Sequence, residues 1–298
     1  MRFGRANPKY TNQLRRFLYL AILATVATAP LLCQSAKSDS PEPAGKKSAP
    51  IIQDNSFLIE EAYNQEDGII QHISAFQRLT SSGDWAYTLT DEWPVRTQKH
   101  QLSVMVAATH SGAFGGAGRG DTALNYRYQL LGSGEAKVAV SPRISLLLAS
   151  GDETQGRGFG GTGVQMSLPA SVVLNRWIVT HWNAGATIIP RSRNAVGNRA
   201  AAHNVNLGQS FVFEPSNRFN VLVETVWSSN ENVVARNKTV RQQSLLINPG
   251  IRWAYNFKSG LQIVPGIAMP IGVGPSSGEK GVFLYLSFEH PFAWSHSR

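Results

Sequence analysis

Apolar and polar residues alternate along the chain from about residue 68 onward, in segments of roughly 10 to 14 residues. Residues 121–131, DTALNYRYQLL, are an example. One parity holds Leu124, Tyr126, Tyr128 and Leu130, and the other holds Asp121, Asn125, Arg127 and Gln129. Successive side chains of a β-strand point to opposite faces, so each segment predicts a strand with one apolar and one polar face.

Strand length and aromatic placement favour a membrane barrel over a soluble β-sandwich. Soluble strands average about 5 to 6 residues, whereas a tilted strand needs about 9 to 11 residues to cross the hydrocarbon layer. Aromatic residues gather toward the segment ends, as in the interfacial girdles of membrane barrels. These residues are Trp85, Trp93, Trp177, Trp227, Trp253, Phe257 and Phe292. The predicted fold is all-β, a transmembrane antiparallel up-and-down β-barrel.

About twelve strands are predicted, an even number as bacterial single-chain barrels require. The approximate segments are 69–79, 84–95, 100–110, 120–131, 136–149, 163–175, 177–190, 203–214, 219–230, 244–257, 261–273 and 281–292. Short connectors at 132–135, 215–218 and 258–260 alternate with longer ones at 111–119, 150–162, 191–202, 231–243 and 274–280. Short periplasmic turns and longer outer loops are expected of such a barrel, with both termini periplasmic.

Composition agrees with this pattern. Apolar residues make up 42% of the 298-residue chain, charged residues only 16%, and the mean hydropathy is −0.17. Soluble domains usually carry about 25% charged residues. A mildly polar chain that is poor in charge fits strands that alternate between lipid and lumen.

The first 36 residues are predicted to be a signal peptide, which implies export to the bacterial outer membrane. They hold Arg2, Arg5, Lys9, Arg15 and Arg16, no acidic residue, and an uncharged apolar run at 17–32. That run contains Pro30 and is shorter than the about 20 residues of a spanning helix, which disfavours an uncleaved anchor. Residues 37–56 are predicted to form a disordered leader and residues 57–298 the barrel.

The net charge of +9 does not indicate nucleic-acid binding. Five of these charges lie in the predicted signal peptide, and the remaining basic residues are scattered. The single cysteine, Cys33, also lies in that peptide, so disulfides and thiolate zinc sites are not expected. Lipidation of Cys33 is disfavoured because Leu32 stands where a small residue is required. The seven histidines are dispersed, and no metal site or cofactor is predicted.

The last predicted strand resembles the C-terminal signal by which the barrel-assembly machinery recognises its clients. Glu279, Lys280 and Gly281 are followed by apolar residues at alternate positions, Leu284, Leu286 and Phe288. The chain departs from that signal by continuing to Arg298 past the usual terminal aromatic residue. Expected partners are therefore this machinery during biogenesis, outer-membrane lipids and small-molecule solutes.

Three stretches carry a family resemblance: residues 57–76 (FLIEEAYNQEDGIIQHISAF), 120–131 (GDTALNYRYQLL) and 167–174 (SLPASVVL). They resemble the outer-membrane transporters named for the meta-pathway of phenol degradation, over about residues 55 to 292. The resemblance implies a porin-like barrel that passes small solutes, aromatic ones among them. It brings no catalytic residues.

Charged residues with lumen parity are the candidate selectivity residues, because charges in a narrow pore set its ion preference. They are Asp121, Arg127, Arg143, His181, Glu224 and Arg252, with Glu92 less surely placed. Ion pairs that only hold the wall together are the alternative. Leu222, Val226, Leu246 and Val264 share the lumen parity and would suit aromatic solutes. The acidic segment 57–67 lies either at the periplasmic rim, which the spacing slightly favours, or in the lumen as a partial plug.

The predicted function is a channel or transporter for small solutes, and two other classes remain open. A barrel enzyme acting on lipid needs a His and a Ser together on the outer face. His110 and Ser111 are adjacent and so point to opposite faces, and no catalytic residue is predicted. Residues 156–161 match GxGxxG, but a dinucleotide site needs a following helix. A structural barrel without conductance would carry larger outer loops.

Overall fold

The computed structural model describes residues 52, 54–114, 116–134 and 136–292. The predicted signal peptide with Cys33, most of the predicted leader, and the six residues after Phe292 lie outside the described residues. In the described part of the chain, no helix is long and apolar enough to span a membrane.

Sixteen strand pieces combine into twelve antiparallel strands, since β4 and β5, β6 and β7, β12 and β13, and β14 and β15 are interrupted single strands. Their bounds are β1 (Ile69–Leu79), β2 (Trp85–Val95), β3 (Thr97–His110), β4 (Ala117–Arg119), β5 (Thr122–Tyr128), β6 (Val138–Val140), β7 (Arg143–Leu148), β8 (Gly163–Asn175), β9 (Ile178–Arg193), β10 (Arg199–Ser216), β11 (Phe219–Ala235), β12 (Lys238–Trp253), β13 (Tyr255–Asn256), β14 (Gln262–Ala268), β15 (Ile271–Gly272) and β16 (Gly281–Pro291). Two short 3-10 turns, Glu153–Gln155 and Gly274–Ser276, lie in connecting loops.

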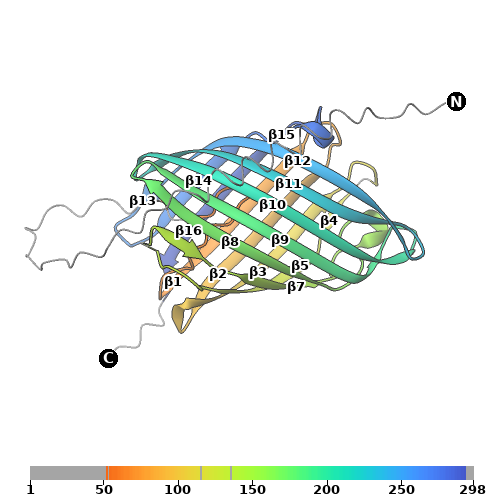
Figure 1. Ribbon diagram of the computed structural model, residues 1–298, viewed down its shortest axis with the longest axis horizontal. Helices are drawn as coiled ribbons and strands as arrows, with labels where there is room; N and C mark the ends of the chain where they lie inside the picture. Colours follow the sequence, from red (N-terminus) through yellow and green to blue (C-terminus); the bar gives the residue numbers. More distant parts are fainter. Residues whose placement is uncertain (1–51, 53, 115, 135, 293–298) are drawn as a thin grey trace, which may run out of the picture. The chain divides into compact units, whose positions relative to one another are not determined.

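The sheet closes on itself, as Figure 1 shows. The last strand, β16, pairs antiparallel with β1 over its full length, from Ile69 opposite Pro291 to Leu79 opposite Gly281. Closure leaves no unpaired sheet edge, which is the condition for a β-structure to cross lipid. The predicted fold class and the predicted number of strands are confirmed.

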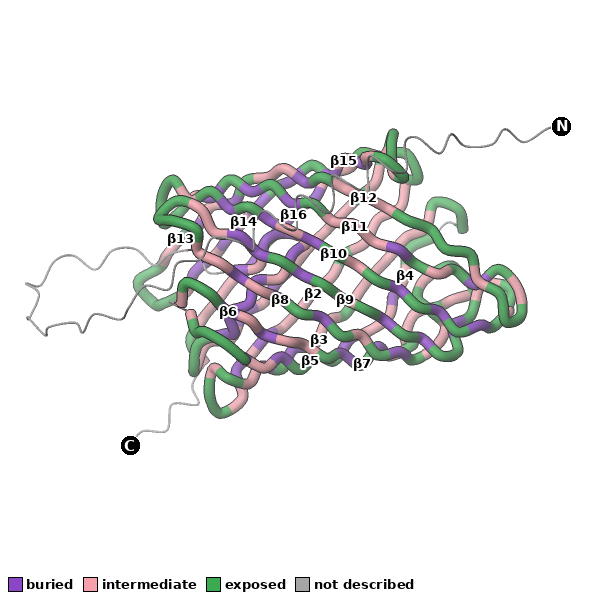
Figure 2. Tube along the Cα trace, viewed as in Figure 1, coloured by how far each residue is buried: buried purple, intermediate pink, exposed green. Residues whose placement is uncertain are grey.

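Burial alternates along the strands as the sequence pattern predicts (Figure 2). In β10 the inward residues Ala200, Ala202, Ser210 and Val212 are buried. Their outward neighbours Val205, Leu207, Phe211 and Phe213 are exposed. Exposed apolar side chains on every neighbouring strand form the band that faces the lipid.

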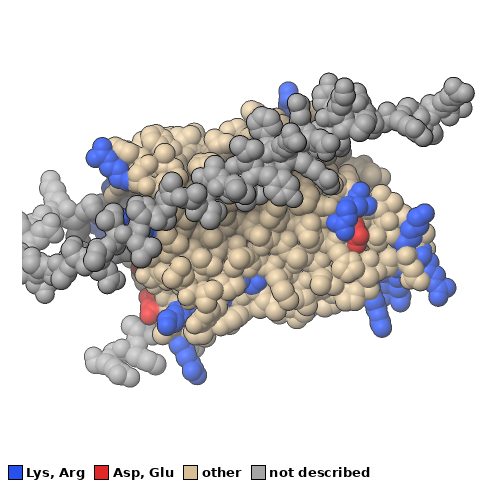
Figure 3. Space-filling view, viewed as in Figure 1, with Lys and Arg blue, Asp and Glu red and all other residues tan. Residues whose placement is uncertain are grey.

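Charged side chains gather mainly near the two ends of the barrel on the face seen in Figure 3. The wall between these ends presents uncharged residues, in agreement with the exposed Leu146, Met166, Leu168 and Ile188 on β7, β8 and β9. A charged side chain facing the bilayer midplane costs about 2–4 kcal/mol, so its scarcity there is the expected signature of a transmembrane wall.

The outer hairpins are longer than predicted. Residues 191–202 and 231–243 were expected as loops, but β9 continues to Arg193, β10 begins at Arg199, β11 continues to Ala235 and β12 begins at Lys238. The alternating apolar pattern is needed only where a strand contacts lipid. Backbone pairing between strands does not need lipid, so the strands can extend beyond that pattern. Asn237, with a φ of 54°, adopts the left-handed conformation that the tight turn between β11 and β12 requires.

The chain preceding β1 lies inside the barrel rather than at its rim. Residues 54–65, here called the lumen segment, form no helix or strand, yet Asp54, Ser56, Ile59 and Ala62 are almost fully buried. Of the two places considered for residues 57–67, the lumen is where residues 57–65 lie, whereas Glu66 and Asp67 are exposed. The predicted leader also ends too late, at residue 56, because Ile52, Asp54 and Ser56 are packed against the wall.

Two matched substitutions on β12 test the lipid-facing band. Ile247 and Ile251 are outward and similarly exposed, at 36% and 38%, but Ile251 is nearer the periplasmic end of β12. Ile247→Arg is expected to lower the free energy of unfolding by about 2–4 kcal/mol and Ile251→Arg by about 1 kcal/mol, because the cost falls toward the interface. Denaturant unfolding in lipid vesicles measures both. Equal losses would contradict the assigned depth of β12.

Candidate functional site

Five of the six predicted selectivity residues point into the lumen and meet the lumen segment or its supports. Arg127 lies on β5, Arg143 on β7, His181 on β9, Glu224 on β11 and Arg252 on β12. Arg127, His181, Glu224 and Arg252 are at most 3% exposed. Their parity in the sequence correctly predicts that these side chains face the lumen. The structure shows in addition that most of their hydrogen-bond donors and acceptors already have partners.

Side chains of the wall accept hydrogen bonds from the backbone amides of the lumen segment. The amides of Leu58 and Ile59 donate to Glu224 Oε1 over 2.8 and 3.1 Å. The amide of Glu60 donates to Asn183 Oδ1 over 2.8 Å. Further along, three amides find three more wall side chains: Ala62 donates to Ser171 Oγ, Asn64 to Gln129 Oε1 and Gln65 to Gln101 Oε1.

Other wall side chains donate to the carbonyls of the same segment. Arg252 Nη1 donates to the carbonyls of Asp54 and Asn55. Arg127 donates to the carbonyls of Glu61 and Tyr63 over 3.1 and 2.9 Å, and to Asn64 Oδ1 over 2.9 Å. An unpaired buried backbone group costs about as much as a lost hydrogen bond, so these contacts allow an irregular peptide to remain buried.

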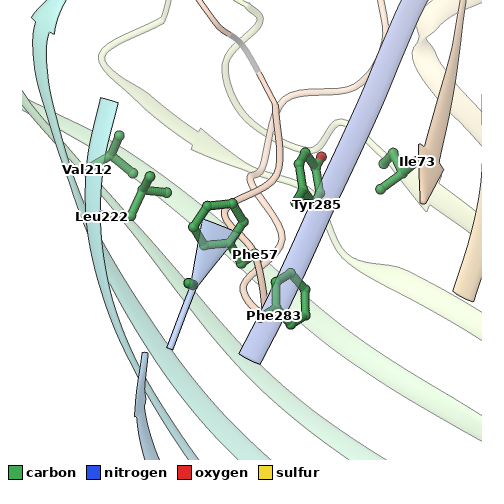
Figure 4. Close-up of a cluster of buried hydrophobic side chains, with 7 residues drawn as sticks. Phe57, Ile73, Val212, Leu222, Phe283 and Tyr285 are labelled. Carbon is green, nitrogen blue, oxygen red and sulfur yellow. The ribbon is translucent and has the colours of Figure 1, made fainter. Parts of the chain in front are cut away.

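Phe57 anchors the segment by apolar contact, as Figure 4 shows. Its ring lies 5.6 Å from that of Phe283 and 5.5 Å from that of Tyr285, both on β16. Val212 and Leu222 belong to the same buried cluster. A Cβ atom on Gly266 would come within 2.5 Å of the Phe57 ring, so the wall needs glycine at this close approach.

Asp54 lies where the first and last strands meet. Its carboxylate accepts hydrogen bonds from Gln71 on β1 and from Tyr285 and Ser287 on β16. All four residues are at most 4% exposed. The beginning of the segment is thus fastened to both sides of the barrel seam.

Arg143 and Glu60 form an ion pair in the lumen that is more exposed than the one between Arg127 and Glu92. Its guanidinium binds the Glu60 carboxylate through two nitrogens, with Nε 3.0 Å from Oε2 and Nη2 2.7 Å from Oε1. The Glu60 side chain remains 30% exposed and that of Arg143 14%. This bidentate geometry is the strong form of an arginine–carboxylate contact.

His181 and Ser171 form a buried pair on neighbouring strands. The two residues are opposite one another in the β8–β9 register, and Ser171 Oγ is 2.7 Å from His181 Nδ1. The two residues are ten apart in sequence and lie on different strands. Parity predicts the face that each side chain occupies, but not the register that places them opposite one another. Ser171 is 0% exposed and supports the Ala62 amide, so it is not placed as an accessible nucleophile.

Asp121, the sixth candidate, does not join the other five. It lies between β4 and β5 at the outer end and accepts hydrogen bonds from the amides of Gly151 and Phe159. It therefore fastens the loop between β7 and β8. This loop contains the GxGxxG match, which is followed by the strand β8 and not by a helix. In the same loop, hydrogen bonds from Thr154 hold the pKa of the exposed Asp152 carboxyl below its ordinary value.

A cavity of about 330 Å³ lies in the lumen beside the segment. The segment residues Phe57 to Glu60 and the loop residue Phe159 line it. The wall contributes polar side chains, namely Thr88, Thr90, Glu92, Ser103, Asn125, Arg143, Gln165 and Thr187. Apolar wall residues are Ile73, Ala75, Met105, Ala123 and Leu147. Glu92, less surely placed from the sequence, is an inward residue of this lining.

Uncharged wall residues were missed by a search confined to charged ones. Gln101, Gln129, Ser171 and Asn183 also accept hydrogen bonds from the segment. Gln101, Ser171 and Asn183 share lumen parity on their strands, so the alternation that identified Arg127 could have identified them too. Among the residues that the structure describes, no group of His, Cys, Asp and Glu is arranged to hold a metal ion.

Comparison with known proteins agrees on the fold and does not assign a family. No protein-family model and no curated protein matches the sequence. The COG4313 outer membrane channel from Pseudomonas putida F1 superposes with a TM-score of 0.57 at 13% identity, covering 78% of this chain and 98% of that one. The NanC porin gives a TM-score of 0.49 at 10% identity, with 74% and 100% covered. The CymD monoaromatic hydrocarbon channel gives 0.42 at 11% identity, with 78% and 90% covered. The superposition on the COG4313 channel shows that this chain shares the β-barrel fold of that protein.

Removing Arg127 tests how the segment is held. Arg127→Leu deletes the donors to Glu61, Tyr63 and Asn64, so the amides of Ala62, Asn64 and Gln65 should exchange about tenfold faster or more, a change of about 1.4 kcal/mol. Hydrogen exchange of the full mature chain in micelles measures this. Arg241→Leu is the matched control, because Arg241 bonds with Ser229, His203 and Glu231 near the outer hairpins and with no residue of the lumen segment. Equal protection in both variants would contradict this role for Arg127.

Proposed function

We propose that this protein is an outer-membrane channel for small solutes, closed at rest by the lumen segment. The observation that carries the proposal is the way the segment is held. Every contact between residues 54–65 and the wall is noncovalent, and most are hydrogen bonds to side chains rather than to a neighbouring strand. Such contacts can be exchanged for water or solute without breaking the barrel's own ladder.

The size and lining of the cavity support small solutes. A volume of about 330 Å³ is at the lower end of ligand-binding pockets, which measure about 300 to 1,000 Å³. Polar and apolar residues share the lining, so a solute with one polar group and a small apolar body would suit it. The selectivity role proposed for Arg127, Arg143, His181, Glu224 and Arg252 then depends on displacement of the segment. Asp121 would act only by holding the outer loop.

Aromatic solutes are the proposed class, on the resemblance to the transporters of the meta-pathway of phenol degradation. The apolar wall residue Leu222 packs against Phe57 at rest, and Val264 packs against Ile52. Displacing the segment would therefore uncover the apolar side chain of Leu222 as well as charge, and displacing Ile52 with it would uncover Val264. Val226 and Leu246, which share that parity, are half-buried on β11 and β12.

Export and assembly complete the proposal. Residues 1–36 would be removed as the signal peptide, and β16, which follows Lys280, would be read by the barrel-assembly machinery. The band of exposed apolar residues would then contact outer-membrane lipids.

A lipid-degrading enzyme is the rival function, and the Ser171–His181 pair is its best candidate within the described residues. Both side chains are buried and face the lumen, with Ser171 beneath the Ala62 amide. A lipid substrate would need to reach them from the opposite side of the wall. The geometry favours a channel over this alternative.

A reversible crosslink tests closure by the segment. Ser56 Oγ donates to Ser210 Oγ over 2.7 Å, so cysteines at these two positions could form a disulfide between segment and wall. In planar bilayers, a mature chain beginning at residue 66 should show larger single-channel steps than the wild-type protein. The oxidised double variant S56C/S210C should lose any large steps, and reduction should restore them.

Two controls make this experiment decisive. The single variant S56C should not respond to oxidation, which excludes damage to the barrel itself. Equal conductance of the shortened and wild-type proteins would count against closure by the segment. Silence of all folded variants would favour a structural barrel.

A further inference from the structure

Arg143 differs from the other lumen arginines in what its guanidinium contacts. Arg127 and Arg252 bind backbone carbonyls of the segment and are 3% and 1% exposed. Arg127 also contacts side chains, with Nε 2.9 Å from Asn64 Oδ1 and Nη2 3.8 Å from Glu92 Oε2. The Arg143 guanidinium contacts side chains alone, and its partner on the segment is the Glu60 carboxylate at the surface of the cavity. Of these three arginines it alone lines that cavity.

The wall holds the Arg143 guanidinium in place without help from the segment. Nη1 donates to Asn125 Oδ1 over 2.9 Å and to Ser145 Oγ over 2.5 Å. Nη2 donates to Gln165 Oε1 over 3.0 Å. These partners lie on β5, β7 and β8, so the guanidinium would keep its orientation if Glu60 moved away. A fixed fork of N–H donors is the usual recognition element for a carboxylate.

Glu60 can release Arg143 without undocking the backbone. Its amide and carbonyl both bond to Asn183, over 2.8 and 2.9 Å, independently of its side chain. Because the side chain is 30% exposed to the cavity, rotation of Glu60 exchanges one carboxylate partner of Arg143 for another. Arg143 then keeps its number of hydrogen bonds and remains paired with a carboxylate.

The rest of the cavity defines what accompanies the carboxylate. Phe57 of the segment, Phe159 of the outer loop, and the wall residues Ile73, Met105, Ala123 and Leu147 present apolar surface. A free carboxylate such as acetate would leave this surface uncovered. A monocarboxylate with a compact apolar body would cover it.

We propose that Arg143 is the solute-binding residue of this lumen, that it takes small apolar monocarboxylates, and that Glu60 occupies its binding site as a tethered competitor. The proposal rests on the channel function given above, but concerns binding rather than conduction. The solute carboxylate takes the place of the Glu60 carboxylate on Nε and Nη2, and its apolar body fills the cavity.

Calorimetric titration of the folded mature protein in detergent tests this site, with sodium benzoate as the probe. Benzyl alcohol has the same apolar body without the charge, and acetate has the charge without the body. Benzoate should bind at least about tenfold more tightly than either, because only benzoate satisfies both Arg143 and the apolar lining. Equal binding of benzoate and benzyl alcohol would overturn the proposal.

Variants assign the effect to the two residues. Glu60→Gln removes the competing charge and should tighten benzoate binding about tenfold. Arg143→Gln should weaken it about tenfold or more, and Arg143→Lys should weaken it less because charge remains without the fork. Arg241→Gln, on the exposed outer hairpin, is the control and should bind as the wild-type protein does.

The failures can be told apart. Unchanged benzoate affinity in both E60Q and R143Q would overturn the site, whatever the conductance. Benzoate binding with the expected variant effects, in a protein that never conducts, would retain the site and refute the channel. If R143Q does not fold, the comparison of benzoate with benzyl alcohol on the wild-type protein and on E60Q still decides.

Discussion

The closed lumen depends on wall side chains that act as hydrogen-bond partners for a peptide without secondary structure. A strand would satisfy its amides and carbonyls by pairing, but the lumen segment has no neighbouring strand to pair with. Glu224, Asn183, Ser171 and Arg127 supply those partners instead. This requirement accounts for an inner face rich in amides, hydroxyls and charges that is nevertheless largely buried.

The lumen side chains divide into two groups by what they bind. Arg252, Arg127 and Glu224 bind backbone groups of the lumen segment. A solute that took the place of those backbone groups would have to present the same amides and carbonyls as a peptide. Arg143 binds a carboxylate on a flexible side chain, which many small molecules can imitate. The first group holds the segment in position, and the second, Arg143, presents a carboxylate-binding guanidinium to the cavity. A channel needs both, since a solute must be selected without the wall being remade.

Alternation predicted the barrel because each strand obeys it locally, and β10 follows it closely from Arg199 to Phe213. It also predicted the direction of Arg127, Arg143 and Glu224. It could not predict their partners, because the contact between Leu58 and Glu224 spans 166 residues and depends on closure of the whole sheet. The position of the lumen segment could not be predicted for a related reason. Its sequence has no periodicity, and its burial depends on contacts with the wall. The lengths of the outer hairpins were predicted wrongly, because backbone pairing between strands extends beyond the alternating apolar pattern used to predict the strands.

The position of Asp54 has a consequence for the order in which the molecule is built. Its partners are Gln71 on the first strand, and Tyr285 and Ser287 on the last, up to 233 residues further along the chain. They come together only when β1 and β16 have paired, and the contact between Asp54 and Ser287 spans 233 residues, more than any pair in the β1–β16 ladder. A peptide that lies ahead of the first strand thus gains its final partner from the last. The contact that fixes the beginning of the lumen segment therefore requires the closed barrel.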